Sequence, residues 1–261
     1  PERVRELLRD AGVVGLGGAA FPSHAKLTAA RSVPMEDLVI NGAECEPYMT
    51  CDDMLMRERA EEIVRGIAIF RDLLGARRVL IGIEDNKPEA VVAMQAAVCG
   101  LAEDYEVVAV PTRYPAGGAK QLIRVLTGKE VPASKRSTEL AVQCFNVATV
   151  YTAYRALAHG EPVVSRIVTL TGNVERPRNW EVRLGTPLGD LVALAADRRR
   201  LGGRPRPLVA AVALRRAPTG PRDHPHLAVR HHGPQPLRAR RGAVDRRHDL
   251  GLGPRPRPQE D

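Results

Sequence analysis

Residues 13–26 combine three closely spaced glycines with a lysine, in the sequence VVGLGGAAFPSHAK. Gly15, Gly17 and Gly18 let the backbone approach a ligand closely and direct bare N–H groups towards an anion. Lys26 follows eight residues after the last glycine, where its ammonium group can reach a phosphate. The same pattern is found in ordinary glycine-rich turns. The loop alone therefore leaves two interpretations open, a phosphate-binding loop and a simple turn.

A second polar cluster, residues 41–47 with the sequence NGAECEP, favours the functional interpretation. The residues before it, Leu38 to Ile40, form a short apolar run bounded by turn residues, which predicts a buried strand. The cluster then lies at the C-terminal end of that strand. In open α/β sheets this is the edge at which ligands bind.

The elements that must position these residues alternate along the first 160 residues. Apolar runs predict strands at 38–40, 78–84 and 105–110. Helical spacing predicts helices at 2–11, from residue 24, at 52–74, 87–99 and 120–126, and within 140–158. This alternation is typical of parallel βαβ units, so we expect an α/β domain over residues 1–160.

The pattern changes after Pro162. Residues 163–171 and 180–184 are strand-like and residues 188–196 are helical, which predicts a small α+β unit over residues 162–197. No apolar run reaches about 18 residues, so no transmembrane helix is expected.

The net charge of +8 is unevenly distributed over the 261 residues. Residues 198–261 contain 16 arginines, no lysine and 5 acids, a net charge of +11, whereas residues 1–197 carry −3. A basic tail can bind nucleic acid or a membrane surface. This one lacks the aromatic residues that accompany single-strand binding, and it is rich in proline, glycine and histidine. We therefore expect a disordered or frameshifted tail and no nucleic-acid partner.

The four cysteines, Cys45, Cys51, Cys99 and Cys144, form no C-x-x-C pair, so no metal site is predicted. Their number does not suggest a secreted disulfide scaffold, which favours a reducing compartment. Because the chain begins with Pro1, we expect a fragment or a processed product.

Six ordered blocks within residues 10–197 together resemble one family, the RnfC proteins of the Rnf electron transport complex. The same blocks are similar to the NADH-binding flavoprotein subunit of respiratory complex I and to the flavoprotein cobalamin reductases of microcompartments. The blocks are GLGGAAFPSHAKL, INGAECEPYMTCDDMLMRE, IGIEDNKPEA, VPTRYPAGGAKQLI, LTGKEVP and VTLTGNVERPRNWEVRLGTPL.

The resemblance implies a Rossmann-like FMN- and NADH-binding domain over residues 1–160, followed by a partial β-grasp, soluble-ligand-binding (SLBB-like) domain over residues 162–197. It implies a peripheral protein at the cytoplasmic face of the inner membrane, with the other subunits of an ion-translocating complex and NADH as partners. Proteins of this family continue into a domain with two [4Fe-4S] clusters. This sequence has no C-x-x-C-x-x-C-x-x-x-C-P motif, so such clusters are not expected in this chain.

The resemblance also implies roles for individual residues. Glu44 and Glu46 match the catalytic acidic pair beside the flavin and the nicotinamide, and Asn41 would contact the flavin. The residues that would hold the FMN phosphate and ribityl chain are Gly15, Gly17, Gly18 and Lys26, and those that close the site are Asn146 and Thr149.

The chain also departs from the family pattern. Ala20 stands where the family usually has glycine, so its methyl group either crowds the cofactor or requires a different φ. Phe145 and Ala148 replace the usual glutamine and glycine. The alternatives are a cobalamin reductase, an inactive truncated remnant, and simple structural roles for Glu44, Glu46 and Lys26 as solvated loop or surface residues.

Overall fold

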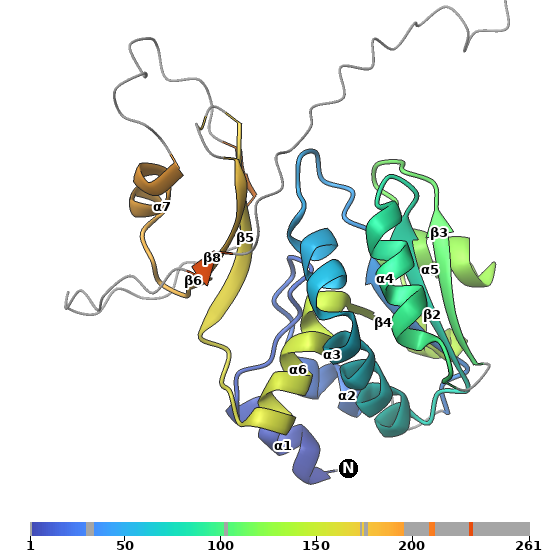
Figure 1. Ribbon diagram of the computed structural model, residues 1–261. Coiled ribbons are helices and arrows are strands. Elements are labelled where there is room, and N and C mark those ends of the chain that lie inside the picture. The colour runs from blue at the N-terminus through green and yellow to red at the C-terminus, as the bar shows by residue number, and fades with distance from the viewer. Residues whose placement is uncertain are drawn as a thin grey trace, which may run out of the picture.

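The computed structural model describes residues 2–29, 34–101, 104–172, 174 and 177–195, and the backbone of residues 209–211 and 230–231. Two sheets organise these residues, one in the first 160 residues and one after them (Figure 1). The elements in chain order are α1 (Glu2–Asp10), α2 (Ser23–Ala29), β1 (Asp37–Gly42), α3 (Cys51–Leu74), β2 (Arg78–Glu84), α4 (Pro88–Val98), β3 (Tyr105–Val110), α5 (Ala119–Thr127), the short 3-10 helix η1 (Ser137–Leu140), β4 (Val142–Asn146), α6 (Val147–His159), β5 (Ser165–Thr171), β6 (Arg178–Arg183), α7 (Leu188–Ala195), β7 (Val209–Ala211) and β8 (Arg230–His231).

The first sheet is entirely parallel and has the strand order β3-β2-β1-β4. Residues of α3, α4 and α6 pack on one face of this sheet, and α5 packs on the other. Parallel strands with both faces covered are buried along their length, and β1 and β2 are accordingly almost continuously buried. The predicted α/β fold of this part is confirmed.

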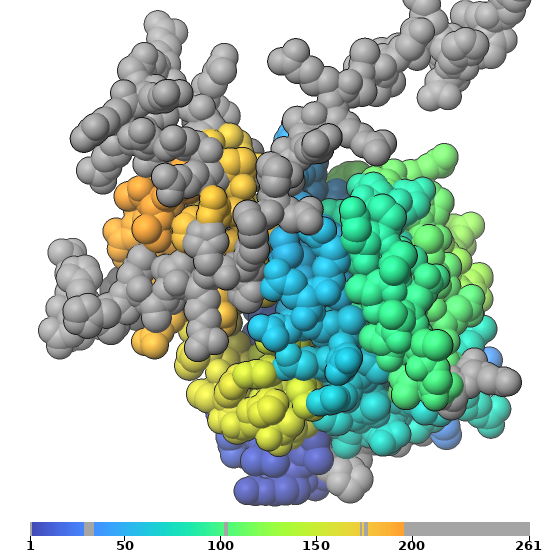
Figure 2. Space-filling model, in the orientation of Figure 1, coloured from blue at the N-terminus to red at the C-terminus, as the bar shows by residue number. Residues whose placement is uncertain are grey.

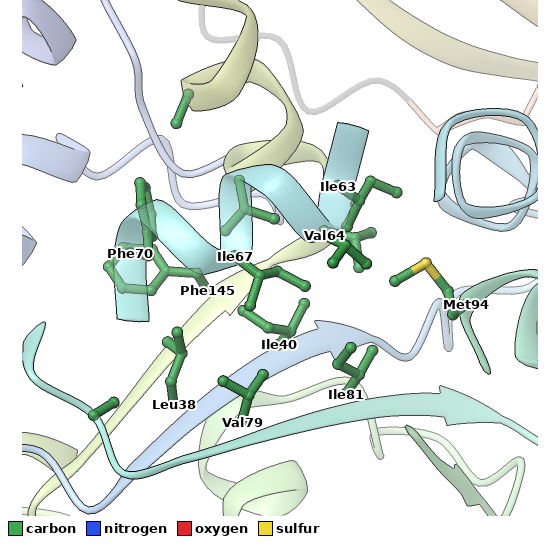
Figure 3. Close-up of a cluster of buried hydrophobic side chains, with 14 of the residues drawn as sticks. Leu38, Ile40, Ile63, Val64, Ile67, Phe70, Val79, Ile81, Met94 and Phe145 are labelled. Carbon is green, nitrogen blue, oxygen red and sulfur yellow. The ribbon is translucent and has the colours of Figure 1, made fainter. Parts of the chain in front are cut away.

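The core between α3 and the sheet follows from helical spacing (Figure 3). Ile63, Ile67 and Phe70 recur on one face of α3 and are fully buried against Leu38, Ile40 and other strand residues. The ring of Phe70 meets that of Phe145 on β4 edge to face, with centroids 4.6 Å apart. This contact fixes α3 over the junction of β1 and β4.

The helices α3 and α6 cross in close backbone contact. A Cβ atom on Gly66 of α3 would lie 2.1 Å from the carbonyl oxygen of Val150 on α6, a distance that no side chain tolerates. Glycine is therefore required at the crossing, and the two helices act as one layer between the two sheets.

One strand was not expected from the sequence. The sequence predicts a helix within residues 140–158, which the structure confirms as α6, but the strand β4 precedes it in that range. The five residues of β4, VQCFN, are apolar enough to continue a helical pattern, and no glycine or proline separates them from α6. Asn146 ends the strand and caps the helix in a single residue, so the boundary leaves no loop in the sequence.

The second sheet is antiparallel, with the order β7-β5-β6-β8. Val168, Leu170, Trp180 and Leu191 form its small core beneath α7. In the space-filling view this gold and orange part lies to one side of α3 and α6 (Figure 2). The predicted α+β character after residue 162 is confirmed, and the predicted tail, residues 198–261, lies outside the described residues except for β7 and β8.

Among the helices in the described part of the chain, none combines the length and the apolar character that crossing a bilayer requires.

The glycine-rich loop of residues 13–22 joins α1 to α2 as a closed turn. Val14 and Pro22 form an isolated bridge, and the Gly15 N–H donates to the Phe21 carbonyl over 2.8 Å. Ala20 adopts a left-handed backbone conformation, with φ of 51°. The sequence predicted that Ala20 would crowd the cofactor or change φ, and the structure shows a positive φ at this position.

An Ala20→Gly variant is therefore expected to be more stable than the wild type. Removing a Cβ from the left-handed region relieves about 1 kcal/mol, and the greater freedom of glycine in the unfolded chain offsets part of it. We expect a net gain of about 0.5 kcal/mol in the free energy of unfolding, measured by urea denaturation. Ala19→Gly, at a residue without positive φ, is the control and should lose stability. Equal losses in both variants would contradict the prediction.

Candidate functional site

The two predicted amide residues meet at the point where the strand order reverses. The chain runs from β1 to β2 and β3 on one side of the sheet and places β4 on the other side of β1. Asn41 near the end of β1 is the register partner of Asn146 at the end of β4. Ligands of open α/β sheets bind in the crevice at such a switch point. The structure thus confirms that residues 41–47 lie at the carboxyl edge of the sheet.

Asn146 organises this crevice through both ends of its side chain. Its Oδ1 accepts from the Ala148 N–H over 3.0 Å and caps α6, while its Nδ2 donates to Asp52 Oδ2 over 2.6 Å. Its Cβ lies 3.3 Å from the position that a Cβ on Gly17 would occupy, so a side chain at Gly17 would press against Asn146. Asn146 therefore connects the glycine loop, α6 and the start of α3.

Asn41 connects the crevice to the second glycine-rich turn. Its Nδ2 donates to the Gly117 carbonyl over 2.8 Å, and its Oδ1 accepts from the Ala43 N–H over 3.0 Å. Both ends of this amide are thus engaged within the chain.

The glycine loop is anchored from two sides and leaves donors free. The Leu16 N–H donates to Thr149 Oγ1 over 2.9 Å, and the Arg166 guanidinium donates to the Leu16 carbonyl from β5. Within the described residues, the N–H groups of Gly17, Gly18 and Ala19 have no acceptor. Successive free amides in a glycine turn form a concave site for an anion.

The first residue of the predicted acidic pair, Glu44, is buried and serves the start of α3. Its carboxylate accepts from the Asp52 N–H over 2.9 Å, from the Asp53 N–H over 3.4 Å and from the Cys51 thiol over 3.2 Å. Lys87 Nζ lies 3.5 Å from the same carboxylate. Glu44 is therefore the capping group of α3, since the N-cap residue Thr50 makes no side-chain cap.

The second residue of that pair, Glu46, is exposed. Its side chain has no hydrogen-bond partner among the described residues. The two acids thus occupy different environments, one inside the protein and one open to solvent and to a ligand.

The side chain of Lys26 makes no hydrogen bond to the glycine loop among the described residues. Its Nζ donates to the Cys144 carbonyl on β4 and lies 4.4 Å from the centroid of the Phe145 ring. Burial lowers the pKa of Lys26. In this structure the loop amides and Arg166, rather than Lys26, supply the positive potential beside the glycines.

A cavity of about 630 Å³ lies between the helix layer and the second sheet. This volume falls in the range of about 300–1,000 Å³ typical of small-molecule sites. Its floor includes Leu16 of the glycine loop, Asp52 of α3 and Ala148 of α6. Charged residues of both signs complete its wall, namely Glu58, Arg59, Arg155, Glu161, Arg166, Glu181 and Arg183.

Asp52, which the sequence did not single out, faces this cavity. One oxygen accepts from Asn146, and the other has no partner among the described residues. Burial and, secondly, the Glu44 carboxylate raise the pKa of Asp52 to about 7, against the effects of the Asn146 hydrogen bond and of Arg166. Two consecutive acids at the first turn of a long helix were the available signal in the sequence.

Glu84, at the end of β2, was also missed. Both of its carboxylate oxygens are buried without a hydrogen-bond partner among the described residues, and burial raises its pKa. An acid at the C-terminal end of a buried strand was the signal that could have found it.

These features fit a phosphate-bearing flavin such as FMN. The free N–H groups of the glycine loop suit the phosphate, and the cavity beside them has room for a cofactor of this size. The side chains of Asn146 and Thr149 hold the loop, so in this structure they shape the site and do not point free donors into it.

Comparison with known proteins gives matches for both sheets. The Nuo51 FMN-binding domain family matches residues 8–155, and the SLBB domain family matches residues 167–196. An NAD+-reducing [NiFe]-hydrogenase, solved in the H2-reduced state, superposes with a TM-score of 0.65 at 22% identity. That likeness covers 75% of this chain and 39% of the hydrogenase chain, and it shows a shared fold.

Several curated relatives are named as the C subunit of an ion-translocating oxidoreductase complex. The protein of Pasteurella multocida is 51% identical over 193 residues, which are 74% of this chain and 23% of the relative. That of Pseudomonas aeruginosa is 48% identical over 75% of this chain and 25% of the relative. That of Rhodobacter capsulatus is 43% identical over 78% of this chain and 40% of the relative. This chain thus spans well under half the length of these relatives.

These matches confirm the predicted resemblance to the RnfC proteins. Since the domain match alone covers more than half of the sequence, the chain belongs to the Nuo51 FMN-binding domain family, and its curated relatives at about 50% identity are the C subunits of ion-translocating oxidoreductase complexes.

Proposed function

We propose that this chain binds FMN at the switch point of its parallel sheet and oxidises NADH as part of a membrane-associated, ion-translocating electron transport complex. The observation that carries the proposal is the set of free N–H groups at Gly17, Gly18 and Ala19, which directly follow Leu16, a lining residue of the cavity of about 630 Å³. Anion-binding amides next to a space of cofactor size are what a nucleotide-like phosphate requires.

Bound FMN would supply the hydride-accepting and electron-transferring chemistry. The chain's own residues bind the cofactor and orient it towards NADH. The loop amides hold the phosphate, and Asn146, which packs against Gly17, keeps that loop at the end of β4. Asn41 holds the second glycine-rich turn through the Gly117 carbonyl. Glu46, exposed at the same edge, is the acid that accepts hydrogen bonds from the nicotinamide carboxamide or ribose hydroxyls.

We place the protein at the cytoplasmic face of the inner membrane as a peripheral subunit, with other subunits of the complex as partners. The names of the relatives support this assignment over cobalamin reduction.

Asp52 gives the site a group that changes charge near neutral pH. In an unfolded chain an aspartate ionises near pH 3.9, whereas the pKa of Asp52 in the folded protein is about 7. Between these values the folded state holds one more proton than the unfolded state, so stability falls as pH rises through this window.

The first prediction from the proposed function concerns the anchor of the glycine loop. Thr149→Val removes the acceptor of the Leu16 N–H with little change of shape, so the loop is less well fixed when the cofactor arrives. We expect the FMN dissociation constant to rise about tenfold, since a lost buried hydrogen bond corresponds to about 1–1.5 kcal/mol. Quenching of flavin fluorescence measures it.

Thr28→Val, on the exposed side of α2, is the matched control and should leave the affinity unchanged. A wild-type chain that neither carries nor takes up FMN would support the inactive remnant instead.

The second prediction separates the two acids. Glu46→Gln should slow reduction of bound FMN by NADH about tenfold, through a lost charge-assisted hydrogen bond, and leave stability unchanged. Glu44→Gln should instead lower the free energy of unfolding by about 1–2 kcal/mol, because it weakens the cap of α3. Anaerobic stopped-flow absorbance and urea denaturation measure the two effects. A stability loss confined to Glu46→Gln would reverse the assignment.

The third prediction tests the charge of Asp52. Asp52→Asn removes the cost of ionising this residue inside the protein. Its stability relative to the wild type should therefore increase by about 2–3 kcal/mol between pH 5 and pH 8, because each pKa unit corresponds to about 1.4 kcal/mol. Urea denaturation across this pH range provides the measurement, with the exposed Asp85→Asn as control. If the free energy of unfolding differs between Asp52→Asn and the wild type by the same amount at every pH, the pKa of Asp52 is not raised into this range.

A further inference from the structure

The residue before α3, Thr50, bonds to the second sheet as well as to α3, where its carbonyl accepts from the Met54 N–H over 3.0 Å. The Thr50 N–H donates to Thr169 Oγ1 over 3.1 Å, and its carbonyl accepts from Asn179 Nδ2 over 3.0 Å. Its hydroxyl donates to Asn179 Oδ1 over 3.1 Å, and the Thr169 hydroxyl donates to the same oxygen over 2.8 Å. These four hydrogen bonds, which we call the Thr50 clamp, engage every polar group of Thr50.

The Thr50 clamp is buried and lies at one cross-strand position. Thr169 is 0% and Asn179 is 3% exposed. The two residues are direct partners in the antiparallel pairing of β5 with β6. A buried amide that loses its partners is costly, so this arrangement has one strongly preferred geometry.

The clamp does not serve to cap the helix. Thr50 makes no side-chain cap on α3, and Glu44 bonds to the first free N–H groups of that helix instead. The start of α3 is thus fixed from one side by Glu44 and from the other by Asn179, which belongs to a different sheet.

A continuous series of contacts leads from the clamp to the glycine loop. Asp52 lies two residues after Thr50 and accepts from Asn146 over 2.6 Å. Asn146 in turn packs against Gly17. A displacement of the first turn of α3 would therefore move the Asp52 carboxylate and release the amide that shapes the loop.

We propose that Asn179 is a positioning residue of the FMN site, which acts through Thr50 to hold Asp52 and Asn146 in the arrangement that receives the cofactor. The inference rests on the proposed FMN binding. It gives the second domain a role in the site, although Asn179 itself lies outside the site.

The test compares Asn179→Leu with Thr50→Ser and Thr50→Val in the full chain. Asn179→Leu removes three bonds of the clamp at similar volume, Thr50→Val removes one, and Thr50→Ser keeps all of them. Hydrogen exchange of residues 51–54, read by mass spectrometry, should speed up about tenfold in Asn179→Leu, less in Thr50→Val and not in Thr50→Ser. Exchange in α4 should not change in any variant.

The second readout is the bound flavin. We expect Asn179→Leu to raise the FMN dissociation constant at least about fivefold and to blur the fine structure of the visible flavin spectrum, with wild-type behaviour restored in Thr50→Ser. Exposed Asn86→Asp is the control for a general effect of altering an asparagine.

Each outcome decides a separate point. Unchanged hydrogen exchange at residues 51–54 in a folded Asn179→Leu protein would show that the Thr50 clamp does not fix the start of α3. Faster hydrogen exchange with an unchanged FMN dissociation constant and an unchanged flavin spectrum would show that the Thr50 clamp is only a structural contact. Asn179 would then not be a positioning residue of the FMN site. If Asn179→Leu does not fold, the comparison of Thr50→Val with Thr50→Ser in the same two measurements tests the same proposal. If the wild type binds no FMN, the proposed function fails, while the exchange data still decide whether the clamp fixes α3.

Discussion

The hydrogen bond between Asn146 and Asp52 is the interaction on which the arrangement of the crevice depends. It joins the end of β4 to the start of α3 across the point where the sheet reverses its order. The other end of the same amide caps α6, and its Cβ fills the space opposite Gly17. One residue thus sets the relation of two helices, one strand and the glycine loop, and the positions of the free loop amides follow from it.

Much of the fold could be predicted because the strands are short apolar runs bounded by turns. The limits of β2 and β3 agree residue for residue with the expected ranges. The strand β4 was not predicted because it passes into α6 without a turn, and Asn146 supplies both the strand end and the helix cap. Periodicity alone cannot separate a five-residue apolar strand from the first turns of a buried helix.

The candidate site was predicted less completely, for a different physical reason. Motifs identify residues near a ligand, but they do not show which side chains are already engaged by the protein. Glu44 is occupied by the N–H groups of α3, and Lys26 is directed to the Cys144 carbonyl. Asp52 and Asn179 act through residues distant in sequence, and no local spacing indicates such contacts.

The free donors of the glycine loop are backbone groups, and this has a consequence for how the site responds to mutation. A phosphate bound by amides depends on the shape of the loop, and that shape is held by Thr149, Arg166 and Asn146, all remote from the loop in sequence. Arg166 belongs to the second sheet, as do both partners of Thr50. The glycine loop and the start of α3 are therefore each secured by residues of the second sheet, so that sheet helps to set the shape of the proposed phosphate-binding loop.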